Sequence, residues 1–334
     1  MSADTRPGLV LGVDGGNSKT IALVARCDGA IVGAARGGST DMYGAGSAEA
    51  ALTALDSVVD GALQVAGAEI AEIEATAFSM AGADWPEDFL LLQAALTGRG
   101  FGGAMVVVND ALGALRAGSR DGSGVSVVCG TGGAVGARGL DGRVWHASWW
   151  QEPQGSRHLA DQTVWAVYRA ELGIDPSTSL TRRLLQIFEQ ETVEGILHAR
   201  TARLGPRPDR HGQVTRALLQ EADLGDRTAL RIVCDHGAAL GDYAVTAARK
   251  VGIEAEPFTL VLTGGVFRHQ GRVLANAVID RVRASCPEVR PVFSRFEPAV
   301  GAVLLALDRL GVSVGEPVLE RLVGTLPPDT LFAT

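Results

Sequence analysis

Short apolar segments separated by glycine-rich or Asp-Gly turns open the chain. They cover residues 9–14, 20–26 and 30–36, and Asp28-Gly29 between the last two is a strong hairpin signal. Short segments bounded by such turns are typical of strands, so the pattern predicts three antiparallel strands.

Helical and strand patterns then alternate. Ser47 precedes an alanine-rich run with helical periodicity, which predicts a helix capped by that serine. Pro86, followed by acidic residues, marks the start of another helix, because both favour the first turn. The predicted elements of this region are strands over residues 75–80 and 105–109, and helices over 47–65, from 84 onwards, and over 111–117.

The order of strand, glycine loop and strand then starts again. Strands are predicted over residues 125–129, 134–138 and 144–148, with a glycine loop at 130–133 and an Asp-Gly turn at 141–142. Both halves of the chain therefore begin with the same order of elements, although their residues differ. Two such units facing each other would place two glycine hairpins across one cleft, and ligand sites are often found between domains.

The remainder of the chain is mostly helical. Residues 157–250 carry a helical pattern, which Pro206-Arg207-Pro208 interrupts. Beyond it, strands are predicted over residues 258–263 and 290–293, a tight turn at Gly264-Gly265, and helices over 268–284, 300–310 and 318–323. Strands that alternate with helices predict an α/β protein.

Composition narrows the class of protein. The chain has 334 residues, 46% of them hydrophobic and 20% charged, which is typical of a globular protein large enough for two domains. The formal net charge is −8 and the sequence lacks a basic run, so no nucleic-acid surface is expected. This charge does not exclude ATP, whose phosphates can be held by backbone N–H groups and a metal ion.

Cysteines and apolar runs indicate a cytoplasmic protein. Cys27, Cys129, Cys234 and Cys286 are widely spaced and form no C-x-x-C pair, so neither a zinc site nor a redox motif is expected. Residues 1–7 lack the apolar core of a signal peptide, and no apolar stretch reaches the ~18 residues that span a bilayer. The sequence therefore predicts no membrane partner.

The turn between the first two predicted strands carries the clearest chemistry. It reads Asp14-Gly15-Gly16-Asn17-Ser18-Lys19-Thr20. No long side chain precedes Lys19, so a ligand can approach the backbone N–H groups, which in such a turn suit an anion. Asp14 would repel a bare phosphate. It therefore suggests a metal ion between the two, and Mg²⁺ is commonly held by one or two carboxylates with substrate phosphates and water.

Two better-known glycine loops do not fit this turn. A Walker loop needs Gly-Lys-Ser/Thr at the start of a helix, whereas here Ser18 precedes Lys19 and a strand follows. The spacing of a dinucleotide fingerprint, G-x-G-x-x-G, is absent. A plain β-hairpin turn remains an alternative, but it would not require Asp14, Ser18 and Thr20 together.

Four motifs in order resemble one superfamily, that of acetate and sugar kinases, heat-shock chaperones and actin. They are Asp14 to Thr20, Asn109-Asp110-Ala111, Gly130-Thr131-Gly132-Gly133 and Thr263-Gly264-Gly265-Val266. Within the superfamily the chain is similar to the branch that unites N-acetylglucosamine kinases with BadF/BadG/BcrA/BcrD ATPases. The resemblance covers residues 9–310. It implies two ribonuclease H-like, actin-like ATPase domains around a nucleotide cleft.

The resemblance also implies domain boundaries and cofactors. An N-terminal domain over residues 1–118 would be completed by a C-terminal helix over 298–311 and the tail to 334, and residues 119–297 would form the second domain with a helical insertion. The expected cofactors are ATP and Mg²⁺. The residues expected to bind ATP are Gly15, Gly16, Asn17, Ser18, Lys19, Thr20, Gly130, Thr131, Gly132, Gly264 and Gly265, with Asp14 at the metal.

Asp110 is the predicted general base. It ends an apolar strand, where a carboxylate packs poorly but can face a cleft. A hydroxyl that attacks a γ-phosphoryl group needs a carboxylate within hydrogen-bonding reach, and the rest of phosphoryl transfer is positioning and charge neutralisation. A helix N-cap is the alternative role for Asp110, and one residue can fill both.

The acceptor side both resembles the family and departs from it. The residues expected to contact the acceptor are Ser39, Thr40, Asp41, Gly82, Asp110, Gln154 and Ser156. Asp41 stands where the family's G-x-S-T-N loop has asparagine, and Pro153-Gln154 stands where sugar kinases carry an acidic pair. Trp149 and Trp150 are additional, and they suit either stacking on a sugar or structural packing.

These features predict an ATP-dependent kinase that phosphorylates a hydroxyl of an amino sugar or related carbohydrate. An ATPase that activates a partner enzyme is the main alternative, but the cysteines lack the pairing that an iron–sulfur cluster at a dimer interface would need. A non-catalytic nucleotide-binding regulator is disfavoured by Asp14 and Asp110. A homodimer is expected, and His146 and His158 are interpreted as structural.

Overall fold

The computed structural model describes residues 8–101, 103–205 and 207–332. The polar segment at residues 1–7 and Pro206 lie outside the described residues. Pro208 falls between two helices, so the predicted interruption of the helical region is confirmed. Among the described residues, no helix is long and apolar enough to cross a membrane.

The first half is a mixed five-stranded sheet with the order β3-β2-β1-β4-β5. Its strands are β1 (Leu9–Gly15), β2 (Thr20–Arg26), β3 (Ile31–Gly37), β4 (Ile73–Met80) and β5 (Ala104–Asn109). The first three strands form the antiparallel meander that the turns predict, and β4 and β5 run parallel to β1. The carboxyl ends of β1, β4 and β5 therefore lie at the same edge of the sheet.

The second half repeats this topology. Its sheet has the order β10-β9-β6-β7-β8, formed by β6 (Gly124–Cys129), β7 (Gly133–Arg138), β8 (Val144–His146), β9 (Thr259–Thr263) and β10 (Arg290–Phe293). Strands β6, β7 and β8 correspond in order and direction to β1, β2 and β3, and β9 and β10 correspond to β4 and β5. The predicted pseudo-repeat and the α/β fold class are confirmed.

Helices cover both sheets. In the first half they are α1 (Ala48–Ala66), the 3-10 helix η1 (Ile70–Glu72), α2 (Pro86–Gly98) and α3 (Asp110–Gly118), joined late in the chain by α10 (Pro298–Arg309), α11 (Glu316–Gly324) and α12 (Asp329–Phe332). Helix α10 packs on β1 and on α3, so a segment from the end of the chain completes the first half. The exact domain boundaries remain a prediction.

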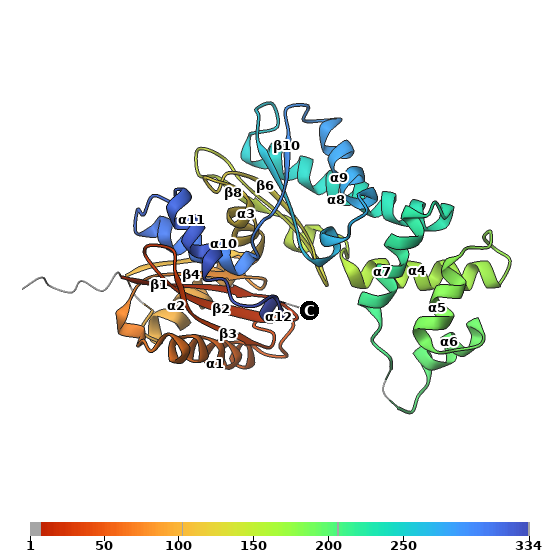
Figure 1. The fold of residues 1–334 in the computed structure, drawn as a ribbon, viewed down its shortest axis with the longest axis horizontal. Coiled ribbons are helices and arrows are strands. Elements are labelled where there is room, and N and C mark those ends of the chain that lie inside the picture. The colour runs from red at the N-terminus through yellow and green to blue at the C-terminus, as the bar shows by residue number, and fades with distance from the viewer. Residues whose placement is uncertain (1–7, 102, 206, 333–334) are drawn as a thin grey trace, which may run out of the picture.

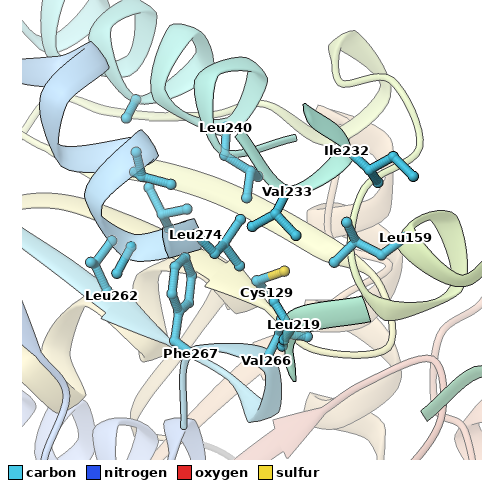
Figure 2. Packing of buried hydrophobic residues seen from close by; sticks show 14 of the residues in the cluster. Cys129, Leu159, Leu219, Ile232, Val233, Leu240, Leu262, Val266, Phe267 and Leu274 are labelled. Carbon is cyan, nitrogen blue, oxygen red and sulfur yellow. The ribbon is translucent and has the colours of Figure 1, made fainter. Parts of the chain in front are cut away.

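The long helical region lies beside the second sheet (Figure 1). It comprises η2 (Ser148–Trp150), α4 (Ser156–Glu171), α5 (Leu180–Phe188), α6 (Val193–Thr201), α7 (His211–Asp223), α8 (Arg227–Val251), η3 (Gly265–Arg268) and α9 (Val273–Arg283). Figure 2 shows how α8, α9 and the strands enclose a buried apolar cluster around Cys129. The first sheet has a separate cluster on each face.

Three local predictions need correction. Asn109, not Asp110, caps α3, because the Asn109 side chain accepts a hydrogen bond from the Ala111 N–H at 3.1 Å. The helix predicted from residue 268 begins at Val273, since a short 3-10 turn and a break come first. The strand predicted over 144–148 ends at His146, because the chain turns into η2.

Candidate active site

A cavity of about 1330 Å³ lies between the two halves. Its lining comes from the carboxyl ends of strands in both sheets, from the loops that follow them, and from α7. The topology explains this position, because equivalent strand ends of two similar units face each other. The cavity exceeds the ~300–1,000 Å³ that is typical of a pocket for one small ligand.

The first glycine hairpin joins β1 to β2 at one wall of the cavity. Its turn is closed by a hydrogen bond from the Gly16 N–H to the Lys19 carbonyl at 3.0 Å, and Asn17 and Ser18 at its tip are exposed. Behind it, the buried Thr20 and Thr40 hydroxyls are 2.8 Å apart. The tip is therefore open to a ligand while its base is fixed by the neighbouring loop.

The second glycine hairpin joins β6 to β7 at the opposite wall. The Gly130 and Thr131 carbonyls accept hydrogen bonds from the N–H groups of Ser156 and Arg157, at 2.9 and 3.2 Å. The start of α4 is thus built onto the back of the hairpin. Thr131 and Gly132 line the cavity on the other side, as a phosphate-binding turn requires.

The loop after β9 forms a third part of the lining. Gly264 has φ of 103°, and a Cβ atom there would lie 2.5 Å from the Cys129 carbonyl oxygen, so only glycine fits. Gly265 is exposed next to it. Arg268 in the same loop forms an ion pair with Glu297, the residue before α10, so this loop contacts the segment that completes the first half.

Lys19 contacts the C-terminal segment. Its Nζ donates a hydrogen bond to the Phe332 carbonyl, and Arg36 donates to the Thr330 and Leu331 carbonyls at 3.4 and 3.3 Å. Burial lowers the pKa of Lys19, which nearby Glu297 opposes. Helix α12 therefore lies against the first hairpin, as Figure 1 shows beside β2.

Asp110 lies on the cavity wall at the carboxyl end of β5, as the first residue of α3. Burial, together with the negative charges of Asp84 and Asp41, raises the pKa of Asp110 to about 7. A carboxylate with this pKa is suited to accept a proton near neutral pH. Because Asn109 provides the helix cap, the Asp110 side chain is available to face the cavity.

Carboxylates and aromatic rings gather beside Asp110. Asp84 Oδ1 accepts hydrogen bonds from Asn109 Nδ2 at 3.1 Å and from the Ser148 hydroxyl at 2.6 Å. The Trp149 ring meets the Tyr43 ring edge-on, with centroids 5.2 Å apart. The contacts of Ser148 and Trp149 cross from η2, in the second half, to loops of the first half. This group of residues is a part of the cavity lining to which both halves contribute.

Ser148 is the strained residue of this bridge. Its φ of 38° lies in the left-handed region, which is costly for a residue with a Cβ atom. Its hydroxyl donates a hydrogen bond to Asp84 and lies 2.6 Å from His146 Nδ1. Because the hydroxyl has one proton, which Asp84 accepts, His146 Nδ1 is the donor to Ser148. These two bonds tie the loop of Ser148 to Asp84 in the first half, and the structural role of His146 remains a prediction.

Comparison with known proteins identifies the family. The model of the BadF/BadG/BcrA/BcrD ATPase family matches residues 11–306. The chain belongs to this family. An N-acetyl-D-glucosamine kinase of Dictyostelium discoideum is 27% identical over 239 residues, 69% of this chain and 74% of that protein. An N-acetylmuramic acid/N-acetylglucosamine kinase of Clostridium acetobutylicum is 24% identical over 305 residues, 89% of this chain and 97% of that protein.

Solved structures share the fold. A candidate N-acetylglucosamine kinase from Chromobacterium violaceum superposes with a TM-score of 0.60 at 21% identity, covering 90% of this chain and 99% of that chain. The predicted family resemblance and the actin-like ATPase fold are thus confirmed. In this member of the BadF/BadG/BcrA/BcrD ATPase family, both glycine hairpins line the cavity between the two halves.

Asp14 supplies a carboxylate that could serve as a metal ligand. It lies half-buried on the cavity wall, and burial, with the charges of Asp110 and Glu297 opposed by that of Lys19, raises its pKa to about 7. A bound cation would relieve the carboxylate repulsion and hold Asp14 ionised. Carboxylate oxygen is the ligand type that Mg²⁺ prefers, so the site fits Mg²⁺ with ATP phosphates as further ligands.

Most predicted site residues line the cavity. These are Asp14, Gly16, Asn17, Ser18, Lys19, Asp41, Asp110, Gly130, Thr131, Gly132, Gln154, Ser156, Gly264 and Gly265. Gly15, Thr20, Ser39, Thr40 and Gly82 do not line it. They lie behind the first hairpin and around Asp41, where they shape the loops. Ligand contact by any of these residues remains a prediction.

Ser148 and Glu297 line the cavity but were not predicted from sequence to do so. Asp84 and Ser148 approach one another from different halves, and Glu297 comes from the end of the chain. Their only sequence signal is that each flanks a predicted strand or helix boundary. Chain distance hides the contact between them, because only the folded topology brings residues 84 and 148 together.

We expect activity to fall below neutral pH. Ordinary aspartates are ionised above about pH 4, but Asp14 and Asp110 both have pKa values raised to about 7. The predicted roles, a cation ligand for Asp14 and a proton acceptor for Asp110, both need the ionised form. We therefore expect kcat/KM for Mg-ATP to fall as pH drops through about 7. A pH profile checks this, and activity that stays constant from pH 8 to pH 5 would contradict it.

Proposed function

We propose that this protein is an ATP-dependent kinase that transfers the γ-phosphoryl group of ATP to a hydroxyl of an amino sugar or a related carbohydrate. The observation that carries the proposal is Asp110, a carboxyl group with pKa raised to about 7 on the wall of a cavity that both glycine hairpins also line. The relatives named as sugar kinases support the carbohydrate class.

Each part of the proposed site has one role in phosphoryl transfer. The acceptor oxygen forms a bond to the γ-phosphorus, the bond to the ADP oxygen breaks, and Asp110 takes the hydroxyl proton. Backbone N–H groups of the two hairpins, around Gly16 and Thr131, would hold the phosphates. Asp14 would hold a bound Mg²⁺, which would neutralise part of the phosphate charge.

The acceptor end favours a ligand rich in hydrogen-bond donors. Asp41 is 9% exposed, Asp84 is half-buried, and both lie with Asp110 on the cavity wall. The lysine and arginine residues of the described lining belong instead to the first hairpin, to α7 with the residue before it, and to the loop after β9. An ammonium group would offset this negative charge, which an acetamido group cannot do.

Gln154 is a further polar residue of the cavity lining, next to Gly133 of the second hairpin. It is 8% exposed, and its Oε1 is buried without a hydrogen-bond partner among the described residues. It stands in place of the acidic pair expected of sugar kinases. Trp149, which is 59% exposed, offers a ring face for stacking at the rim. We therefore propose a sugar with a free amine, glucosamine being one candidate, in preference to N-acetylglucosamine.

A comparison of acceptors tests this proposal. We expect kcat/KM for glucosamine to exceed that for N-acetylglucosamine by ~10-fold, the value of about one charge-assisted hydrogen bond. Glucose and larger glycans complete the set, and the measurement is a coupled assay of ADP formation. A tenfold preference for N-acetylglucosamine would show that this interpretation of the pocket is wrong.

The ATPase alternative predicts a different dependence on acceptor. In that case ATP hydrolysis would proceed without a sugar and would drive a partner enzyme through domain closure. The cysteines do not favour it, since Cys129 and Cys286 are buried, Cys27 is half-buried and Cys234 lies exposed on α8. The use of Mg²⁺, a homodimer and a cytoplasmic location remain predictions.

A further inference from the structure

The imidazole of His236 lies buried directly behind the second glycine hairpin. His236 belongs to α8 and is 3% exposed. Its Nε2 accepts a hydrogen bond from the Gly155 N–H at 3.2 Å and lies 3.9 Å from the Cys129 sulfur. Figure 2 shows Cys129 among Leu159, Val233 and Leu274, so the sulfur that His236 approaches belongs to the apolar core.

This hydrogen bond fixes the protonation state of the ring. A backbone N–H can only donate, so Nε2 has to be unprotonated and the imidazole proton is on Nδ1. Nδ1 is buried and has no hydrogen-bond partner within the described residues. Burial, and secondarily the nearby His158, lowers the pKa of His236 to about 3. The ring is therefore a neutral acceptor at physiological pH.

The groups around the ring do not alter that state. His158 on α4 stacks against it with centroids 5.8 Å apart. Burial raises the pKa of the Cys129 thiol, on β6, to about 12, so the thiol is uncharged. Neither contact provides a hydrogen bond to Gly155. The acceptor function at this point of the core belongs to His236.

Gly155 packs directly against the second glycine hairpin. Its φ is 94°, and a Cβ atom there would lie 2.4 Å from the carbonyl carbon and oxygen of Gly132. The next two residues, Ser156 and Arg157, donate their N–H groups to the hairpin carbonyls of Gly130 and Thr131. A shift of Gly155 therefore moves the hairpin on which the phosphate site depends.

We propose that His236 is a positioning residue that holds the second glycine hairpin in its phosphate-binding geometry by accepting the Gly155 N–H. The inference rests on the proposed function only in that the hairpin binds nucleotide. An apolar residue at position 236 would fill the space but leave the buried Gly155 N–H without an acceptor, and such a group is costly. The loop would then move toward another acceptor and carry Gly132 with it.

Three variants test the proposal. His236→Leu removes the acceptor, His236→Gln can return an amide oxygen near the position of Nε2, and His158→Leu makes the same change in the stacked ring that does not bond Gly155. We expect His236→Leu to raise the Kd for Mg-ADP and the KM for ATP by ~10-fold, the worth of one hydrogen bond. The KM for the acceptor should stay near wild type, as should the His158→Leu variant, and His236→Gln should recover most of the affinity that His236→Leu loses.

Isothermal titration with Mg-ADP measures the effect without any acceptor. Wild-type affinity in His236→Leu would overturn the proposal, as would equal losses in His236→Leu and His158→Leu. Nitrogen NMR of the histidine rings in the wild-type protein gives an independent readout, even if His236→Leu does not fold. It should report His236 neutral with the proton on Nδ1 from pH 6 to pH 8, and a proton on Nε2 would overturn the proposal. Absence of nucleotide binding in the wild type would instead contradict the proposed function.

Discussion

Replacing Asp110 by asparagine is expected to lower kcat by ~10²–10⁴, the usual contribution of a general base. The amide cannot take the proton of the attacking hydroxyl, while its size and shape are nearly those of the carboxyl group. Burial beside Asp84 and Asp41 raises the pKa of Asp110 to about 7, so removal of the charge should not destabilise the protein at pH 8. Steady-state kinetics and thermal unfolding, at pH 8, check the two halves of this expectation.

Two controls separate catalysis from folding. The Kd for Mg-ADP should change little in Asp110→Asn, because Asn109 still caps α3 and the hairpins are untouched. Asp121→Asn makes the same chemical change just after α3, outside the cavity lining, and should keep wild-type kcat. If Asp110→Asn turns over at the wild-type rate, Asp110 has only a structural role.

Replacing Asp14 by asparagine is expected to weaken Mg-ADP binding by ~10–100-fold and leave metal-free ADP binding nearly unchanged. The carboxylate is the protein group that we assign to the metal, and an amide oxygen carries no charge. Titration calorimetry with ADP, in the presence of either Mg²⁺ or a chelator, measures both affinities. Equal losses under the two conditions would show that Asp14 acts on the hairpin and not through a cation.

The same variant should not lose stability without ligand. The pKa of Asp14 is raised from 3.8 to about 7 in the folded protein, so the native state binds more protons than the unfolded state between those values. In the wild type, the contribution of Asp14 to the free energy of unfolding therefore declines as pH rises from about 4 to about 7. It stays at the lower value above pH 7. At pH 8 the melting temperature of Asp14→Asn should match or exceed that of the wild type. Asp28→Asn, which makes the same chemical change in the next turn, is the matched control for this measurement. A large loss in Asp14→Asn would indicate a structural turn.

Much of the fold could be predicted because its signals are local. The turns around Asp28-Gly29 and Gly130 to Gly133 delimit short apolar runs, and those runs became β1 to β3 and β6 to β8. The repeat of that order predicted two similar sheets, which the shared strand order confirms. Asp110 was identifiable because a carboxylate at the end of an apolar strand is unusual.

The rest depended on contacts between residues distant in the chain. Nothing near Asp84 indicates that Ser148 will reach it from the other half, or that His236 will meet Gly155. The boundary at Asn109 was misjudged because adjacent asparagine and aspartate are both good caps, and only the folded geometry chooses between them. Ligand identity is the remaining gap, because a carbohydrate pocket is formed by several loops and no single motif defines it.

The central claim is transfer of a phosphoryl group to a carbohydrate hydroxyl. Phosphorus NMR of the wild-type protein with Mg-ATP and glucosamine, alongside a sample without sugar, tests it most directly. We predict equal amounts of ADP and a sugar phosphate ester in the first sample and little ADP in the second. With Asp110→Asn the ester should form ~10²–10⁴-fold more slowly. Formation of ADP and inorganic phosphate at the same rate with and without every sugar tried would contradict the kinase assignment and favour an ATPase.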